Sequence, residues 1–257
     1  MNWAIDWAAP WYSHWRVTGE EVMHHAAGGR DLYDALNQQQ PAGVTFVPPN
    51  EFPSGVAYEQ FIFQQTRCPT REGMHDFFNG LAWLVMPQAK RQLNRVQAAQ
   101  IAERGVIPQR GPVRDAATLF DENGAVLHAP EALWHALAAR EWRRLFVELR
   151  PLWAQAKLLV FGHALLEKLV RPRKNLAAHV WAYPCPTGAI AGMDAWLASE
   201  LTADRLAAKP FLPLPVLGIP GWWPENGNFS FYDDPLVFRP AGRQEPKITT
   251  PAAASCP

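Results

Sequence analysis

Hydrophobic residues recur with helical spacing between residues 74 and 86. Met74, Phe77, Phe78 and Leu81 occupy positions i, i+3, i+4 and i+7, which places their side chains on one face of a helix. Pro87 ends or kinks this helix, and a second helix is expected from there to about residue 104. The pattern therefore predicts two consecutive helices in this part of the chain.

Other segments have shorter or less regular patterns. Helices are predicted over residues 131–153, with a break near Pro151, and over 163–170 and 193–208. A helix over 20–37 could be capped by Thr18, although Gly28-Gly29 interrupts it. Residues 57–65 fit a helix or a strand. Trp83 lies beside the apolar face of the 74–86 helix and is predicted to be buried.

Strand signals are found in three places and a turn signal in a fourth. Residues 43–47 end in two prolines, residues 157–161 are followed by Gly162, and residues 176–183 are largely apolar. Asn123-Gly124 lies between two apolar runs, which is the strongest short-range signal of a hairpin. We therefore expect a hairpin that joins strands 118–121 and 125–127.

Together these elements predict an α+β fold. Its short mixed sheet would include the hairpin and be covered by amphipathic helices. The chain has 24 prolines and 12 tryptophans, and both enrich its irregular terminal segments. Tryptophan can anchor such segments because it combines a large apolar surface with one polar N–H. With no internal repeat and no clear linker, we expect one domain over residues 1–242 and a flexible tail over 243–257.

Charge and composition exclude several functions. The 24 basic and 24 acidic residues cancel, so the chain has no strong global signal for nucleic acid or an anionic membrane surface. No apolar run reaches the length of about 20 residues that a membrane helix needs. The start of the chain is unlike a secretion signal, and three cysteines without Cys-x-x-Cys spacing argue against a disulfide framework. A cytoplasmic protein with a small-molecule ligand fits these properties, while its oligomeric state stays open.

Several long motifs make the chain recognisable. They are TRCPTREGMHDFFNGLAW at 66–83, PQAK at 87–90 with Asn94, RDAATLFDENG at 114–124, FGHALLEK at 161–168, and the segments 220–224 and 238–240. Through these motifs the chain resembles a family of bacterial proteins known as domain of unknown function 3025. The resemblance extends over nearly the whole chain. It implies a set of landmark residues and no particular activity.

The first candidate site is a polar group on the 74–86 helix. His75 and Asp76 both neighbour Asn79, because residues three and four apart on a helix lie side by side. Such a group could bind a metal ion or orient an imidazole as a general base. Alternatively, the acid could stabilise the start of the helix and the imidazole could bind a loop carbonyl.

The second candidate is His163 with Glu167, four residues apart on a helix that directly follows a strand. This spacing is compatible with one divalent metal ion, although a hydrogen bond on the helix surface would explain it equally well. His75 is the best partner for this pair. The predicted metal ligands are therefore His75, His163 and Glu167.

The third candidate surrounds the predicted hairpin. Arg114 could bind a phosphate or carboxylate through two hydrogen bonds, and Lys90 is a second candidate for substrate binding, while Asp115 joins the catalytic candidates. Asp121 and Glu122 are adjacent, so on a strand they would point to opposite faces and would not share an ion. We interpret them as part of the turn.

The resulting hypothesis is a metal-assisted hydrolase acting on a small anionic or phosphate-ester substrate. Catalysis would involve His75, Asp76, Asn79 and Asp115, with one divalent metal ion as cofactor. The alternative is a non-catalytic binding or scaffold protein in which the same residues are structural. The enzyme hypothesis requires that His75 and His163 face one pocket, with Arg114 on its rim.

Overall fold

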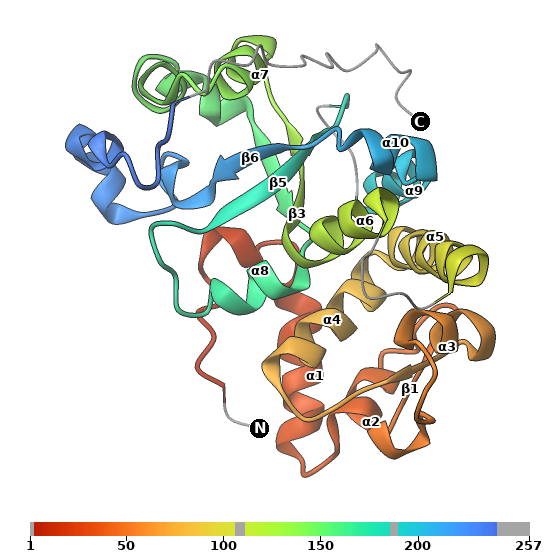
Figure 1. The fold of residues 1–257 in the computed structure, drawn as a ribbon. Helices are drawn as coiled ribbons and strands as arrows, with labels where there is room; N and C mark the ends of the chain where they lie inside the picture. Colours follow the sequence, from red (N-terminus) through yellow and green to blue (C-terminus); the bar gives the residue numbers. More distant parts are fainter. Residues whose placement is uncertain (1–2, 106–110, 186–189, 241–257) are drawn as a thin grey trace.

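The computed structural model describes residues 3–105, 111–185 and 190–240, which form an α+β fold (Figure 1). Its main element is a mixed sheet of four strands in the order β4-β3-β5-β6. β3 pairs antiparallel with β4 and parallel with β5, and β6 pairs antiparallel with β5 at the end of the sheet. The strands are β3 (Gly124–His128), β4 (Lys157–Val160), β5 (Ala177–Ala182) and β6 (Leu212–Pro215).

A second, two-stranded sheet lies apart from the first. β1 (Thr45–Val47) corresponds to the strand predicted before Pro48, and it pairs in parallel with β2 (Arg67–Pro69), which was not predicted. β2 leads directly toward the helix that carries His75. The small sheet thus fixes the start of that helix.

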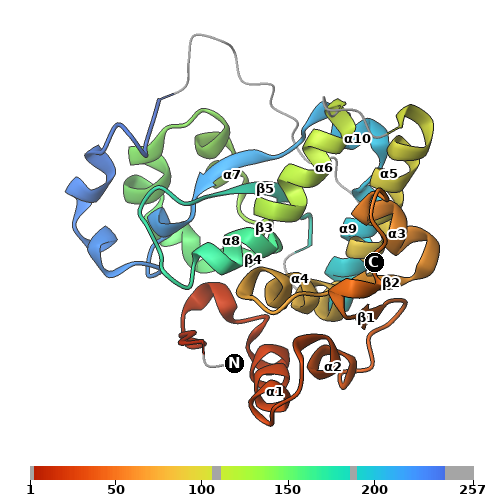
Figure 2. The same ribbon diagram turned by 60° about the horizontal axis from the view of Figure 1, so that its bottom comes forward.

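Helices surround both sheets. In the view of Figure 1, α4 and α8 lie below the four-stranded sheet, α6 lies to the right of β3 and α7 lies above the sheet. α1 and α2 lie beyond α4 in both Figure 1 and Figure 2. α8 contacts both α4 and α6, and α5 contacts α3, α4 and α6. The helices are α1 (Arg16–Ala27), α2 (Leu32–Asn37), α3 (Tyr58–Gln65), α4 (Met74–Val85), α5 (Pro87–Arg104), α6 (Pro112–Asn123), α7 (Glu131–Ala138), α8 (His163–Lys168), α9 (Ile190–Glu200) and α10 (Ala203–Ala208).

The predicted hairpin at Asn123-Gly124 is wrong. Residues 118–121 belong to α6, and the chain passes from α6 straight into β3. Gly124 has φ −71° and ψ 154°, which is extended backbone rather than the positive φ of a hairpin turn. A helix is more stable here because Pro112 occupies its first turn. Its buried face is formed by Val113, Ala116, Ala117 and Phe120.

Three other predicted helices differ in their boundaries. Gly28-Gly29 separates α1 from α2, with Gly29 at φ +85°. Residues 131–153 form α7, then a π-helical turn (Arg144–Glu148) and a 3-10 helix (Arg150–Gln155). The region 193–208 divides at Thr202, whose side chain accepts a hydrogen bond from the backbone N–H of Arg205 and so starts α10. Residues 57–65 fitted either a helix or a strand in the sequence, and the structure has a helix there, α3 (Tyr58–Gln65).

Aromatic side chains anchor the irregular terminal segments, as expected. Trp15 is fully buried and its Nε1–H donates to the carbonyl of Val160, 3.0 Å away, while the Tyr12 hydroxyl donates to the carbonyl of Leu166. Near the other end of the described chain, Tyr232 stacks on Phe146. Trp83 is 3% exposed, which confirms its predicted burial. The predicted tail, 243–257, lies outside the described residues.

Within the described ranges, no helix combines the length and apolar character needed to cross a membrane.

Candidate functional site

A pocket of about 470 Å³ lies where α3, α4, α5 and α6 meet the start of α8. Its volume is within the range of small-molecule sites, about 300–1,000 Å³. Its lining mixes polar side chains with aromatic and aliphatic ones. The lining residues from these helices are Tyr58, Glu59 and Ile62 of α3, His75, Asp76, Asn79 and Trp83 of α4, Lys90, Leu93, Asn94 and Gln97 of α5, Thr118, Asp121 and Glu122 of α6, and His163 of α8.

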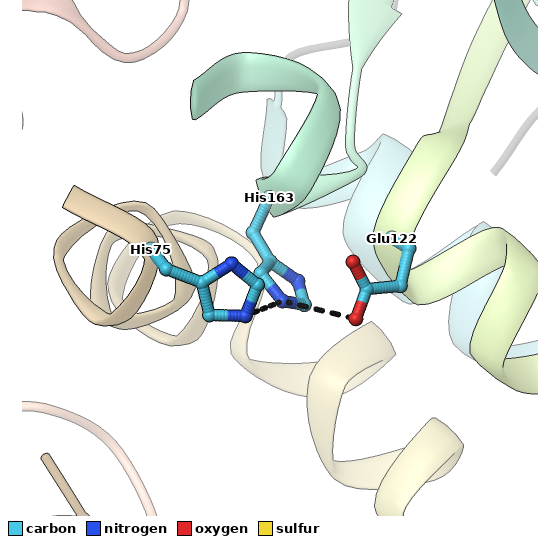
Figure 3. A group of neighbouring side chains, drawn as sticks. All are labelled: His75, Glu122 and His163. Atoms are coloured by element: carbon cyan, nitrogen blue, oxygen red, sulfur yellow. Dashed lines mark hydrogen bonds and ion pairs between the residues drawn. The ribbon is translucent and has the colours of Figure 1, made fainter. Parts of the chain in front are cut away.

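Two imidazoles and one carboxylate converge at the polar end (Figure 3). The Nε2 atoms of His75 and His163 are 3.2 Å apart, with the rings edge to face. Oε1 of Glu122 lies 3.8 Å from Nε2 of His163. One potential ligand atom from each residue lies within 4.8 Å of the other two. The expectation that the two histidines face one pocket is therefore confirmed.

The junction between α6 and α8 brings His163 next to Glu122. The backbone N–H groups of Phe161 and Gly162 both donate to the carbonyl of Gly124, at 2.9 and 2.8 Å. A Cβ atom at position 162 would lie 2.5 Å from the backbone N and Cα of Asn123 and from the carbonyl oxygen of Glu122. Only glycine permits this approach, which sets the first residue of α8 against the last turn of α6.

Glu167 contacts His75 rather than lying beside Nε2 of His163. Its Oε2 is 3.0 Å from Nδ1 of His75. An ionised carboxylate only accepts hydrogen bonds, so Nδ1 of His75 is the donor and the Nε2 lone pair is directed toward His163. Glu167 therefore orients a predicted ligand and is not part of the group of converging ligand atoms.

His163 is held in a buried, polar corner. The side chain is 4% exposed, and burial lowers the pKa of its imidazole to about 4, against the opposing effect of the nearby Asp121 carboxylate. Its Nδ1 is buried and makes no hydrogen bond within the part of the chain that the structure describes, and the nearest carboxylate oxygen, Oδ2 of Asp121, is 3.8 Å away. At neutral pH the ring is uncharged, as a metal ligand must be.

Lys90 is engaged with the protein itself. Its Nζ donates to Oδ1 of Asp121 at 2.5 Å and to Oδ1 of Asn79 at 2.9 Å. Burial alone would raise the pKa of the Asp121 carboxyl, but the opposing effects, of which the charge of the Lys90 ammonium is the largest, lower that pKa. The ammonium group predicted to bind substrate is thus already compensated by a carboxylate, and Asn79 holds it in place.

Asp76 has a similar local function. Its Oδ2 accepts from the backbone N–H of Arg71 at 2.6 Å and from Arg71 Nε at 3.1 Å, and its Oδ1 accepts from Arg71 Nη2 at 3.0 Å. The pair fastens the loop before α4. Both residues line the pocket, but Asp76 is not near the converging ligand atoms that include His75.

Arg114 and Asp115 are not among the residues that line the pocket. Arg114 is buried on α6 and Asp115 is exposed in the first turn of that helix. The predicted position of Arg114 on the rim is wrong. Residues 112–123 form a helix rather than a hairpin, and Arg114 is buried in the first turn of this helix.

Glu122 is the residue that sequence reasoning missed. On a strand Asp121 and Glu122 would face opposite ways, but on a helix neighbours diverge by only about 100°, so both reach the pocket. Burial raises the pKa of the Glu122 carboxyl. The buried spacing of Val113, Ala116 and Phe120 could have identified the helix, and with it the acid near His163.

Comparison with known proteins gives one match. The sequence model of a family described as "Protein of unknown function (DUF3025)" matches residues 44–242, which include the residues of the site named above. No similar curated protein and no similar solved structure was found.

Proposed function

The chain belongs to the DUF3025 family, and we propose that its pocket binds one divalent metal ion, with zinc as the best fit, and catalyses metal-assisted hydrolysis. The observation that carries this proposal is the convergence of His75, His163 and Glu122, from three different helices, at one end of a pocket of substrate size. Two histidines and one glutamate are the ligands of one class of catalytic zinc sites, with the fourth position left to water.

The distances support a shared ion. Two nitrogens that bind one tetrahedral zinc at about 2.0–2.1 Å are separated by about 3.3–3.4 Å, and the two Nε2 atoms are 3.2 Å apart. Glu122 Oε1, at 3.8 Å from His163 Nε2, needs only a small rotation to join them. The same ligand set also suits non-haem iron, so the metal preference must be measured.

A carboxylate lies near the Nδ1 atom of each histidine, on the opposite side of the ring from the metal-binding Nε2. Glu167 contacts Nδ1 of His75 at 3.0 Å and Asp121 lies 3.8 Å from Nδ1 of His163. Histidines that bind metals usually donate their second ring N–H to such a group, which fixes the tautomer and strengthens the ligand. This arrangement favours metal binding over a simple contact between two imidazoles.

Hydrolysis is the proposed reaction because the three metal ligands line a pocket that can hold a substrate beside the ion. A bound metal lowers the pKa of coordinated water to about 7 and polarises the bond to be broken. In the hydrolysis, the water oxygen bonds to the electrophilic carbon or phosphorus, the bond to the leaving group breaks, and the water proton ends on the leaving group. The chain holds the substrate in the pocket, which opens directly beside the three ligands.

Metal binding by the untagged protein tests the proposal. After removal of metal with a chelator, calorimetric titration with Zn²⁺, Mn²⁺ and Fe²⁺ should give one equivalent of the preferred ion, and saturation at 100 times Kd should stabilise the fold by about 2.7 kcal/mol. His75→Ala and Glu122→Gln should weaken binding strongly, whereas the exposed His24→Ala and Glu131→Gln should not. Equal binding by all variants, or none by the wild type, would refute the site.

Activity is tested with the same preparations. Carboxylic ester, amide and phosphate ester probes should include at least one class that the metal-loaded protein hydrolyses and the chelated protein does not. Glu122→Gln should abolish this hydrolysis. Metal binding without metal-dependent turnover of any class would leave a binding protein and contradict the enzyme proposal.

A further inference from the structure

Gln97 lines the pocket away from the metal ligands. Its side chain is 5% exposed, and its amide makes no hydrogen bond within the described chain. The amide is not among the fully buried unpaired polar atoms of the described chain, so it reaches the open space of the pocket, where a bound molecule can pair with it. The Gln97 amide is therefore available to hydrogen-bond a molecule in the pocket.

The position of Gln97 defines the length of that molecule. Lys90 and Gln97 are seven residues apart on α5, so they share one face and are separated by about 10 Å along the helix axis. Lys90 contacts Asp121, whose neighbour in sequence is the ligand Glu122. A molecule that reaches both the metal and Gln97 must therefore be extended by roughly this distance.

Part of the pocket wall is apolar. Phe52 and Tyr58 are in edge-to-face contact with each other, and Trp83 is almost completely buried. Ile62 and Leu93 add aliphatic surface. This part of the pocket suits a hydrocarbon chain or ring.

The charges of the pocket do not favour an anion. Both cations are already paired, Lys90 with Asp121 and Arg71 with Asp76. Apart from the histidines, the charged side chains in the described lining comprise two basic and four acidic groups, which a divalent ion would balance. They are Arg71, Lys90, Glu59, Asp76, Asp121 and Glu122.

We propose that the substrate is a neutral, extended molecule, with its scissile carbonyl at the metal and a carboxamide-like edge bound by Gln97. A glutamine amide offers one donor and one acceptor side by side, so it pairs with another amide through two hydrogen bonds. This inference rests on the proposed metal site. It replaces the anionic substrate expected from Arg114 and Lys90.

Hydroxamates that differ only at their far end test the proposal. The hydroxamate group binds the metal, and an eight-carbon chain carries a terminal carboxamide, carboxylate or methyl group toward Gln97. Calorimetric titration of the zinc-loaded protein should show the carboxamide binding about 10- to 100-fold more tightly than the methyl compound, as expected for two added neutral hydrogen bonds. The carboxylate should bind no more tightly than the methyl compound.

Substitutions on α5 test whether Gln97 causes the preference for the carboxamide. Gln97→Leu should remove the preference for the carboxamide, whereas Gln100→Leu, on the exposed part of α5, should retain it. Tightest binding of the carboxylate, or an unchanged preference in Gln97→Leu, overturns the inference. Acetohydroxamate, which is too short to reach Gln97, separates the two proposals. If it binds in a zinc-dependent way and the preference is absent, only this inference fails, and if it does not bind, the metal site itself fails.

Discussion

Replacing Gly162 with alanine probes the junction that assembles the site. Gly162 has φ −63° and ψ 114°, a conformation that alanine adopts without strain. The effect of the substitution is therefore steric. The added Cβ would lie 2.5 Å from the N and Cα atoms of Asn123 and from the carbonyl oxygen of Glu122. All three are backbone atoms and cannot rotate away, so α8 must move from α6 by about 1 Å to reach ordinary contact.

Two measurable losses follow from this shift. Overpacking of this kind lowers the free energy of unfolding by about 1–3 kcal/mol, which should appear as a lower urea midpoint with an unchanged m-value. Because His163 begins α8 and Glu122 lies in the last turn of α6, their ligand atoms should also separate. Zinc affinity should then fall by about 10-fold or more, as for other disturbed metal sites.

Gly192→Ala is the matched control. Gly192 lies within α9, and a Cβ there would meet nothing within 4 Å. This substitution should leave zinc affinity unchanged and stabilise the fold by up to about 1 kcal/mol, since alanine favours helix more than glycine does. If Gly162→Ala behaves like this control in both measurements, the close approach of α8 to α6 is not what assembles the site.

Three further substitutions test the surroundings of the pocket. Trp83→Ala should lower the free energy of unfolding by about 3–5 kcal/mol, because Trp83 is 3% exposed, and a near-zero change in the urea midpoint would contradict its packing. Lys90→Met should cost up to about 3–5 kcal/mol, because the Asp121 carboxylate, whose side chain is 20% exposed, loses its compensating charge. Lys90→Met combined with Asp121→Asn should recover part of that loss. Burial raises the pKa of the Cys68 thiol from 9.0 to about 11, so between these values the unfolded chain loses this proton first. Stability should therefore fall as pH rises from 9 to 11, by up to about 3 kcal/mol, and Cys68→Ala should show a smaller loss over the same range in urea titrations.

The predictable parts of the fold have local causes. The face formed by Met74, Phe77 and Leu81 defines α4, and Pro87 marks the boundary with α5. The hairpin predicted from Asn123-Gly124 was wrong because the dipeptide reflects only the local preference for a turn. Contacts of Phe120 with Phe161, Trp181 and Phe211 favour a helix at 112–123 instead. Such contacts are between distant parts of the chain and leave no mark in a short sequence window.

The residues of the candidate site also divide into those that the local sequence predicts and those that it does not. His75 and His163 could be chosen as a pair because each lies near a helix start with an acid nearby. The partner of each acid could not be deduced, because Glu167 is four residues from His163 in sequence but contacts His75 through the packing of α8 on α4. Glu122 could be identified only after residues 112–123 were assigned to a helix. Gln97 has no sequence signal, since its role depends on a cavity that forms only in the folded protein.

The prolines of β6 protect the open edge of the sheet from association. The backbone N–H of Val216 donates to the carbonyl of Leu176 at 3.1 Å, so by the alternation of an antiparallel pair the nitrogens of Leu214 and Leu212 face β5 as well. The nitrogens of Pro213 and Pro215 then face outward and carry no hydrogen. A strand from another molecule would find no N–H donor along this edge, which discourages the edge-to-edge pairing that leads to aggregation.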